Sequence, residues 1–223
     1  MNRHWFSAAA CGLALSVLPA VSAQAATQVM NFDNACLYSG GACPVQASYG
    51  DTPQTNVSYR AYRAVGGETV HGHLQWWDVG YGDLQGVVFG GSNATGYVSE
   101  IKFTAAPGYQ LSLLDFDLAT YAGRSGSTPV SILDLAGNLL STFTADTAWP
   151  KHGHVSANTD YLDGVILRWG PDGYEVGLDN IRYDVRAIGS AVPEPGIWAM
   201  MILGTGCVGA ALRRRRTLRP VTA

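Results

Sequence analysis

The sequence has few charged residues, and few of those in its central part are basic. Charged side chains make up 14% of the 223 residues, and the formal net charge is −3. Between residues 26 and 192 there are eight basic and sixteen acidic residues, which leaves this stretch near −8. Such a surface argues against nucleic acid or anionic lipid as a partner. It is compatible with cation binding.

Common motifs of enzyme active sites are missing from the same stretch. It contains no G-x-S-x-G nucleophile elbow, no H-E-x-x-H zinc motif and no Gly-rich phosphate loop. The pairs Asp115/Asp117 and Asp160/Asp163 have a spacing that is common by chance, whereas a glycosidase needs two carboxylates that face one cleft. The sequence therefore predicts a protein that is not an enzyme, with a polysaccharide hydrolase as the less favoured alternative.

Residues 26–187 also lack a long helical period. Instead, short β-branched and aromatic runs alternate with turn residues, as in an all-β domain. About 8–10 strands fit into this length, which predicts a two-sheet antiparallel β-sandwich of the jelly-roll type. The clearest predicted strands are 97–105, 109–121, 162–170 and 176–185, together with a hairpin over 129–145 that turns at Ala136-Gly137-Asn138.

The predicted strand 109–121 alternates regularly. Strict alternation places Leu111, Leu113, Asp115 and Asp117 on one face, opposite Leu114, Phe116 and Leu118.

Residues 1–25 have the parts of a secretory signal peptide. Arg3 is the basic part, an apolar stretch follows, and Ala23 and Ala25 stand at the −3 and −1 positions of an A-x-A cleavage site. We therefore predict a signal helix that is removed after Ala25. A permanent N-terminal anchor is the less favoured alternative, because the apolar stretch is too short to span a bilayer.

The C-terminal end combines a proline-containing linker, an apolar run and a basic cluster. Residues 188–195 are the predicted linker and end in VPEP, whose prolines disfavour helix. Residues 196–212 are apolar and uncharged, and as a helix of about 26 Å they would just cross a thin bilayer core. Residues 213–223 form a basic tail that would hold this end in the cytoplasm. It begins with Arg213, Arg214, Arg215 and Arg216.

This order of elements resembles the PEP-CTERM sorting signal. Pro193, Glu194 and Pro195 are followed by the hydrophobic span and then by the arginine cluster, as in that family. The family occurs on exported proteins of Gram-negative bacteria that make extracellular polysaccharide. The resemblance implies transient anchoring in the inner membrane, processing by an exosortase-type membrane peptidase, and a final place at the cell surface or in the extracellular matrix. It does not imply a biochemical activity.

Cysteine is scarce. Four cysteines are present, of which Cys11 lies in the predicted signal peptide and Cys207 in the predicted membrane span. The remaining pair, Cys36 and Cys43, is most simply a disulfide in an exported domain. A zinc site is the poorer alternative, because no histidine lies nearby in the sequence.

The segment VGLDNIRYDV at 176–185 resembles the last strand of galactose-binding-like and carbohydrate-binding-module jelly rolls. In such modules the aspartate of a DN-I motif often helps to bind a structural calcium ion, together with an acidic residue near the first strand. Asp179 matches the motif, and Asp33 is the candidate partner. Calcium takes 6–8 oxygens, which carboxylates and backbone carbonyls can supply. The alternative is that Asp179 caps a turn and Asp33 is solvated.

The sequence His-Gly-His occurs twice, at His71 and His73 and at His152 and His154. Residues i and i+2 of a strand share a face, so each pair could present two imidazoles, and four could hold a transition metal. The favoured alternative is four exposed histidines on loops or strand ends.

Three aromatic residues, Trp76, Trp77 and Tyr81, lie in the Gly-rich stretch LQWWDVGYGDLQG. Their rings could stack on sugars, with Asp78 or Asp83 binding hydroxyls. Alternatively one tryptophan lies in the core and the other at its rim, because adjacent strand residues face opposite sides.

Taken together, these features predict an exported, non-enzymatic surface or matrix protein associated with exopolysaccharide in a biofilm. The main alternative is a lectin-like module that binds carbohydrate through the Trp76–Tyr81 region.

Overall fold

The computed structural model describes residues 25–36, 42–90, 96–124, 126–147 and 149–188. The predicted signal helix, most of the predicted linker, the predicted transmembrane helix and the basic tail lie outside the described residues. Within the described ranges the chain forms thirteen strands and no helix. Accordingly, none of the described residues belongs to a helix long and apolar enough to cross a membrane.

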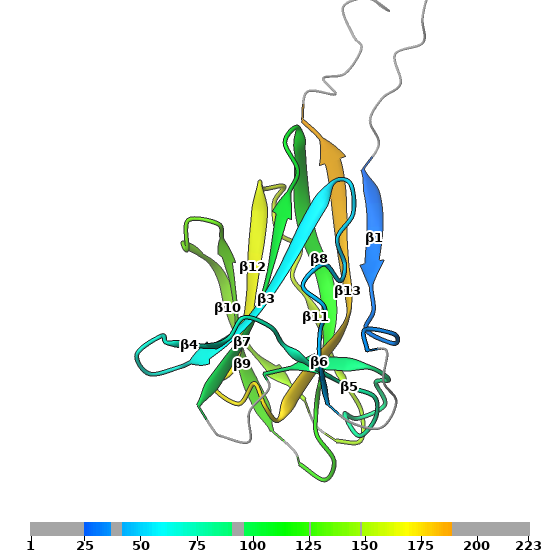
Figure 1. Ribbon diagram of the computed structural model, residues 1–223, viewed down its shortest axis with the longest axis vertical. Helices are drawn as coiled ribbons and strands as arrows, with labels where there is room; N and C mark the ends of the chain where they lie inside the picture. Colours follow the sequence, from blue (N-terminus) through cyan, green and yellow to red (C-terminus); the bar gives the residue numbers. More distant parts are fainter. Residues whose placement is uncertain (1–24, 37–41, 91–95, 125, 148, 189–223) are drawn as a thin grey trace, which may run out of the picture. The chain divides into compact units, whose positions relative to one another are not determined.

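The strands form two antiparallel sheets, so the predicted all-β class with two antiparallel sheets is confirmed (Figure 1). The seven-stranded sheet has the order β11-β8-β13-β6-β5-β2, and β1 also pairs with β13. Its strands are β1 (Ala26–Met30), β2 (Cys43–Pro44), β5 (Gln75–Trp77), β6 (Val87–Phe89), β8 (Tyr109–Thr120), β11 (Gly153–Ser156) and β13 (Val176–Ala187).

The six-stranded sheet has the order β10-β9-β12-β7-β3-β4. Its strands are β3 (Thr55–Arg63), β4 (Thr69–His71), β7 (Tyr97–Ala105), β9 (Ser127–Asp134), β10 (Leu139–Asp146) and β12 (Gly164–Trp169). The strand count exceeds the predicted 8–10 because several of the strands, such as β2 and β4, have only two or three residues. Such short pairings leave too little alternation to be recognised in a sequence.

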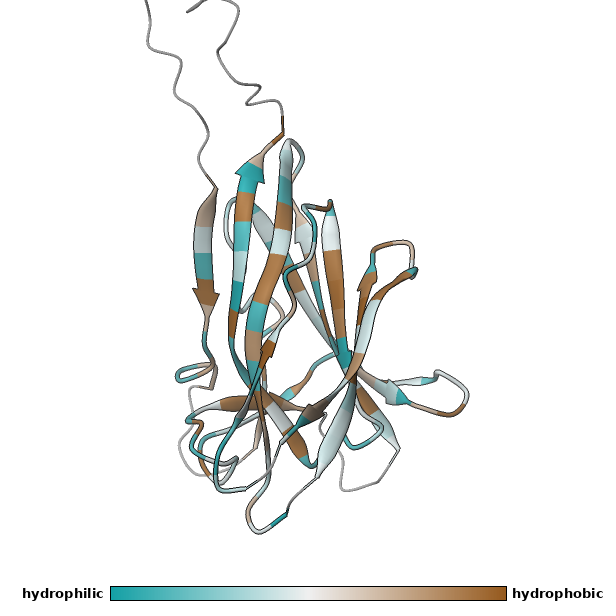
Figure 2. Cartoon of the chain, turned by 180° about the vertical axis from the view of Figure 1, so that it is seen from behind, coloured by the Kyte–Doolittle hydropathy of each residue, from teal (hydrophilic) through white to brown (hydrophobic). Residues whose placement is uncertain are grey.

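The inward faces of both sheets share one hydrophobic core. Phe103 of β7 and Trp169 of β12 meet Phe116 of β8 and Tyr183 of β13 there, and all four are almost fully buried. Figure 2 shows the corresponding alternation of hydrophobic and hydrophilic residues along the long strands. The predicted strand 97–105 is confirmed as β7, in which Tyr97, Ser99, Ile101 and Phe103 are buried and Lys102 is exposed.

The strict alternation predicted for β8 is wrong. Leu111 and Leu113 lie in the core, but so do Phe116 and Leu118, so the strand changes phase between them. The paired strand β13 has matching irregularities, because its register with β8 shifts between Asp179 and Tyr183. An extra residue in a strand reverses the faces of all residues that follow it. As a result, both ends of β8 supply leucines to the core, and Asp115 and Asp117 are not part of it.

The hairpin between β9 and β10 turns where the sequence predicts. Gly137 has a φ of +88°, which suits glycine. The side chain of Asp134 closes the turn, because its two oxygens accept hydrogen bonds from the backbone N–H of Asn138 at 2.8 Å and from the Asn138 side chain at 2.7 Å.

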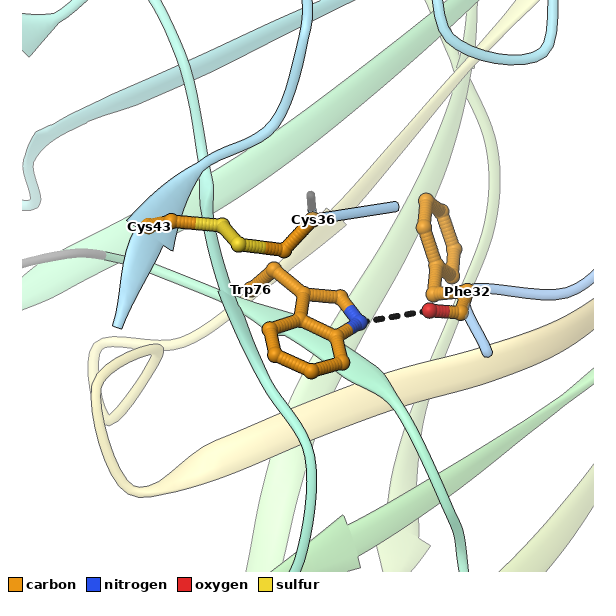
Figure 3. The surroundings of a disulfide bond; sticks show 4 residues. All are labelled: Phe32, Cys36, Cys43 and Trp76. Carbon is orange, nitrogen blue, oxygen red and sulfur yellow. Dashed lines mark hydrogen bonds between the residues drawn. A yellow bond between two sulfur atoms is a disulfide. The ribbon is translucent and has the colours of Figure 1, made fainter. Parts of the chain in front are cut away.

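The predicted disulfide between Cys36 and Cys43 is confirmed. It lies beside Trp76, whose indole N–H donates a hydrogen bond to the carbonyl of Phe32 (Figure 3). The bond therefore links the segment after β1 to β2, next to a buried ring.

Replacing both cysteines with serine should lower the free energy of unfolding by about 2.5 kcal/mol, the chain-entropy value for so short a loop. Urea unfolding of the full chain in mild detergent, followed by tryptophan fluorescence, measures this change. Wild-type protein under reducing conditions is the matched control and should show the same loss. Equal stability of the oxidised wild type and the double variant would contradict the prediction.

Candidate functional site

The aromatic residues singled out in the sequence are largely internal. Trp76 is 6% exposed and Tyr81 is 3% exposed, and the Tyr81 hydroxyl donates a hydrogen bond to the carbonyl of Tyr174 at 3.1 Å. Neither ring offers a face to a sugar. Trp77 is half-buried and packs edge-on against Tyr121. The alternative of one core tryptophan and one at the rim therefore describes this stretch.

The two His-Gly-His sequences lie at distant edges of the sheets. His71 is on β4, one edge of the six-stranded sheet. His154 is on β11, an edge of the seven-stranded sheet that packs beside β10, at the opposite edge of the six-stranded sheet. The idea of one metal site with four histidines is therefore wrong. No set of three or more His, Cys, Asp or Glu among the described residues is arranged to hold a metal ion.

Each pair on its own does bring two imidazoles to one place. The rings of His71 and His73 are 5.2 Å apart between centroids. Burial, and then the neighbouring His71, lower the pKa of His73.

The second pair belongs to a group that we call the His–Asp cluster, made of Asp83, Asp117, His152 and His154. His154 on β11 lies directly opposite Asp117 on β8, and its Nδ1 is 2.8 Å from a carboxylate oxygen of Asp117. Nδ1 of His152 is 2.8 Å from Asp83, and its Nε2 is 3.9 Å from the second oxygen of Asp117. Two imidazoles and two carboxylates therefore alternate along one surface.

The loop that carries Asp83 is held against the segment before β11. The carboxylate of Asp83 accepts a hydrogen bond from the backbone N–H of His152 at 2.9 Å and lies 3.2 Å from the ammonium of Lys151. Gly82 permits this approach, because a Cβ there would lie 2.7 Å from the Lys151 carbonyl oxygen. The hydrogen bond from His152, aided by Lys151, lowers the pKa of Asp83 to about 2, although desolvation opposes the change. This carboxylate is therefore ionised at any physiological pH.

The neighbouring carboxylates on β8 also have donors. The side-chain amide of Asn180 donates to Asp117 at 3.0 Å, and Arg182 forms a two-point ion pair with Asp115 that includes a bond of 2.7 Å. The hydrogen bond from Arg182 holds the pKa of Asp115 below its ordinary value. This part of the seven-stranded sheet thus carries polar groups that hydrogen bonds and ion pairs hold in place.

The His–Asp cluster could not be assembled from the sequence. The histidines and the Asp115/Asp117 pair were each recognisable there, but His154 and Asp117 are 37 positions apart and Asp83 is further away. Only the pairing of β11 with β8 brings them together.

The two predicted calcium ligands do lie close together. Asp179 is 2% exposed, and its Oδ1 accepts a hydrogen bond from the backbone N–H of Phe32, the residue before Asp33. Burial raises the pKa of Asp179 to about 6, backbone hydrogen bonds from Asn180 and Phe32 oppose the rise, and the charges of Asp33 and Asp117 add to it. A buried carboxylate beside a second one favours a proton or a cation.

The sequence pattern of the C-terminal end identifies its role. Residues 191–216 match the model described as the PEP-CTERM protein-sorting motif. The chain carries a PEP-CTERM sorting signal. The matched range includes Pro193, Glu194, Pro195 and the four arginines from Arg213 to Arg216, so the resemblance seen in the sequence is confirmed. A signal of this kind implies export, sorting at the membrane and processing by an exosortase.

The β domain of this chain has weak structural similarity to solved proteins. A family 35 carbohydrate binding module from Clostridium thermocellum is 17% identical with a TM-score of 0.32, over 67% of this chain and 100% of that one. A family 29 carbohydrate binding module variant is 10% identical with a TM-score of 0.28, over 59% of this chain and 92% of that one.

The isomalto-dextranase of Arthrobacter globiformis T6, solved with panose, is 13% identical with a TM-score of 0.32, over 73% of this chain. This chain spans 33% of that enzyme's length. Similarity at this level does not identify a ligand or an activity. No curated protein sequence matches the chain.

Proposed function

We propose that this protein is an exported, non-enzymatic component of the cell surface or extracellular matrix that associates with exopolysaccharide. A membrane peptidase of the exosortase type cleaves its tail and frees the β domain. The observation that carries the proposal is the PEP-CTERM motif at residues 191–216, at the opposite end of the chain from a signal-peptide pattern.

The chemistry of the tail supports this course of events. Proline has no backbone N–H and disfavours helix in the residue before it, so VPEP favours an extended backbone that a protease can bind as a strand. The arginine cluster resists translocation and would keep the apolar run in the membrane until cleavage.

The test replaces Pro193, Glu194 and Pro195 together with alanine. We expect the variant to accumulate uncleaved in the inner membrane of its native host, with little or none released, because the cleavage motif is lost. Fractionation followed by intact-mass analysis measures both the location and the two ends of the chain.

Arg219→Ala is the matched control, because it alters the basic tail outside the matched range. It should be processed like the wild type. If the alanine variant were released with the same mass as the wild type, the proposed sorting route would be wrong.

We also propose that Asp33 and Asp179 hold a structural calcium ion. The support is the burial of Asp179, its raised pKa and the charge of Asp33 close to it. Two carboxylates do not complete a calcium shell, so backbone carbonyls or water would supply the other oxygens. An ion at this point would neutralise two repelling carboxylates and connect the segment after β1 to β13.

A further inference from the structure

A row of charged side chains crosses the outward face of the six-stranded sheet. Arg60 on β3 and Arg168 on β12 both pair in register with Glu100, which lies between them on β7. Arg60 Nε and one of its Nη atoms are 2.5 and 2.8 Å from the two oxygens of Glu100, and Arg168 Nε is 2.6 Å from one of them. A single carboxylate therefore serves two guanidinium groups.

Among the described residues, one positive charge of this row has no counter-charge. The side chain of Glu100 is only 6% exposed, while those of Arg60 and Arg168 are 41% and 26% exposed. Burial disfavours the ionised form of Glu100, but the hydrogen bonds from the two arginines outweigh it, so the pKa lies below its ordinary value. Glu100 remains an anion and can neutralise only one of its two partners.

Two further residues extend this surface. Lys102 occupies the next outward position on β7, is exposed, and has no ion-pair partner among the described residues. The ring of Tyr62 on β3 packs against both arginines, with guanidinium carbons 5.0 Å (Arg60) and 5.6 Å (Arg168) from its centroid. We call Arg60, Tyr62, Glu100, Lys102 and Arg168 the basic face.

The basic face stands out against the rest of the domain. The outward positions of β3, β7 and β12 carry three positive charges and one negative charge, whereas residues 26–192 together are near −8. Glu100 hydrogen-bonds both arginines, but its single negative charge can neutralise only one of them and leaves Lys102 unmatched. A local positive surface on an acidic protein is suited to an anion of modest charge density.

We propose that the basic face binds an acidic polysaccharide whose sugar units carry carboxylates, such as a polyuronate. This inference rests on the proposed function, which places the protein among extracellular polysaccharides. Guanidinium groups bind carboxylates through paired hydrogen bonds, and Tyr62 holds both guanidinium groups at the surface. Adjacent strands place these side chains next to one another, where an extended polymer can contact several of them.

Charge density favours this ligand over a nucleic acid. Duplex DNA carries about one charge per 1.7 Å, so a bound duplex would extend beyond the basic face over the surrounding acidic surface and be repelled. A polyuronate carries one charge per sugar unit and can be matched by a few cationic groups.

The test measures binding of the full chain, in mild detergent, to polygalacturonate by isothermal titration calorimetry. Dextran is the neutral probe and duplex DNA the phosphate probe. We expect binding to polygalacturonate alone, weakened by added salt because the contacts are ionic. Arg168→Gln should reduce the affinity about tenfold, the value of one charge-assisted hydrogen-bonded contact, while Glu100 keeps Arg60 as its partner.

Lys102→Gln gives a second variant that leaves every described ion pair intact, and it should also weaken binding. The matched controls are Arg186→Gln and Lys151→Gln, which remove the same charges outside the basic face and should bind like the wild type. Equal binding to dextran or DNA, no binding to polygalacturonate, or unchanged affinity in both basic-face variants would overturn the proposal. Normal release of Arg168→Gln from cells would then show that the sorting route still holds.

Discussion

Replacing Asp179 with asparagine is expected to stabilise the β domain by about 2–3 kcal/mol well above pH 6, when no divalent cation is present. The pKa of Asp179 is raised to about 6 in the folded state, from 3.8, mainly by burial. Above that pH the folded protein holds a desolvated anion. Asparagine removes the charge but keeps an oxygen that can accept the hydrogen bond from the Phe32 N–H. Urea unfolding of the full chain in detergent and chelator measures the difference.

The pH dependence follows from the same shift. Between pH 4 and 6 the folded protein binds a proton at Asp179 that the unfolded chain does not, so this residue makes the domain more stable as the pH falls through that range. The stability advantage of Asp179→Asn should therefore be largest above pH 6 and disappear near pH 4. Asp83, Asp115 and Glu100 act in the opposite sense, because their lowered pKa values stabilise the folded protein at neutral pH and this stabilisation is lost in acid below about pH 4.

Calcium should reverse the order of the two proteins. An ion held by Asp33 and Asp179 stabilises the ionised wild type, since it binds the folded state only, and it has no such effect on Asp179→Asn. Asp163→Asn, at an exposed position, is the matched control and should respond to calcium like the wild type. A wild type that shows neither a calcium effect nor a pH effect in this range would contradict both the site and the raised pKa.

Trp76→Ala is expected to cost about 3–5 kcal/mol, as for other buried aromatic residues. The ring lies in the core beside the Cys36–Cys43 disulfide, and its N–H satisfies the carbonyl of Phe32 (Figure 3). Trp76→Phe keeps most of the packing and should cost only about 1–2 kcal/mol, for the lost hydrogen bond.

Thermal and urea unfolding measure this structural role, and a binding measurement separates it from a role in sugar binding. Trp76→Phe should bind polygalacturonate as the wild type does, because Trp76 is only 6% exposed and is not part of the basic face. Trp77→Phe is the comparison, since a half-buried ring should cost less than its buried neighbour. A Trp76→Ala variant as stable as the wild type would contradict the core assignment.

The sequence determined the features that depend on residues close to one another along the chain. The sorting signal at 191–216, the hairpin turn at Gly137, the disulfide between cysteines seven positions apart and the alternation of β7 are all local patterns. Their physical basis is the preference of a few neighbouring residues, which does not require knowledge of strand pairing.

The tertiary structure decided which distant residues share a surface. The matching irregularities of β8 and β13 changed the face on which Asp117 lies, and the pairing of β11 with β8 placed His154 against it. The pairing of β3 and β12 with β7 likewise placed two arginines on Glu100. Because one extra residue in a strand reverses every side chain after it, these surfaces depend on sheet register, which distant parts of the chain fix together.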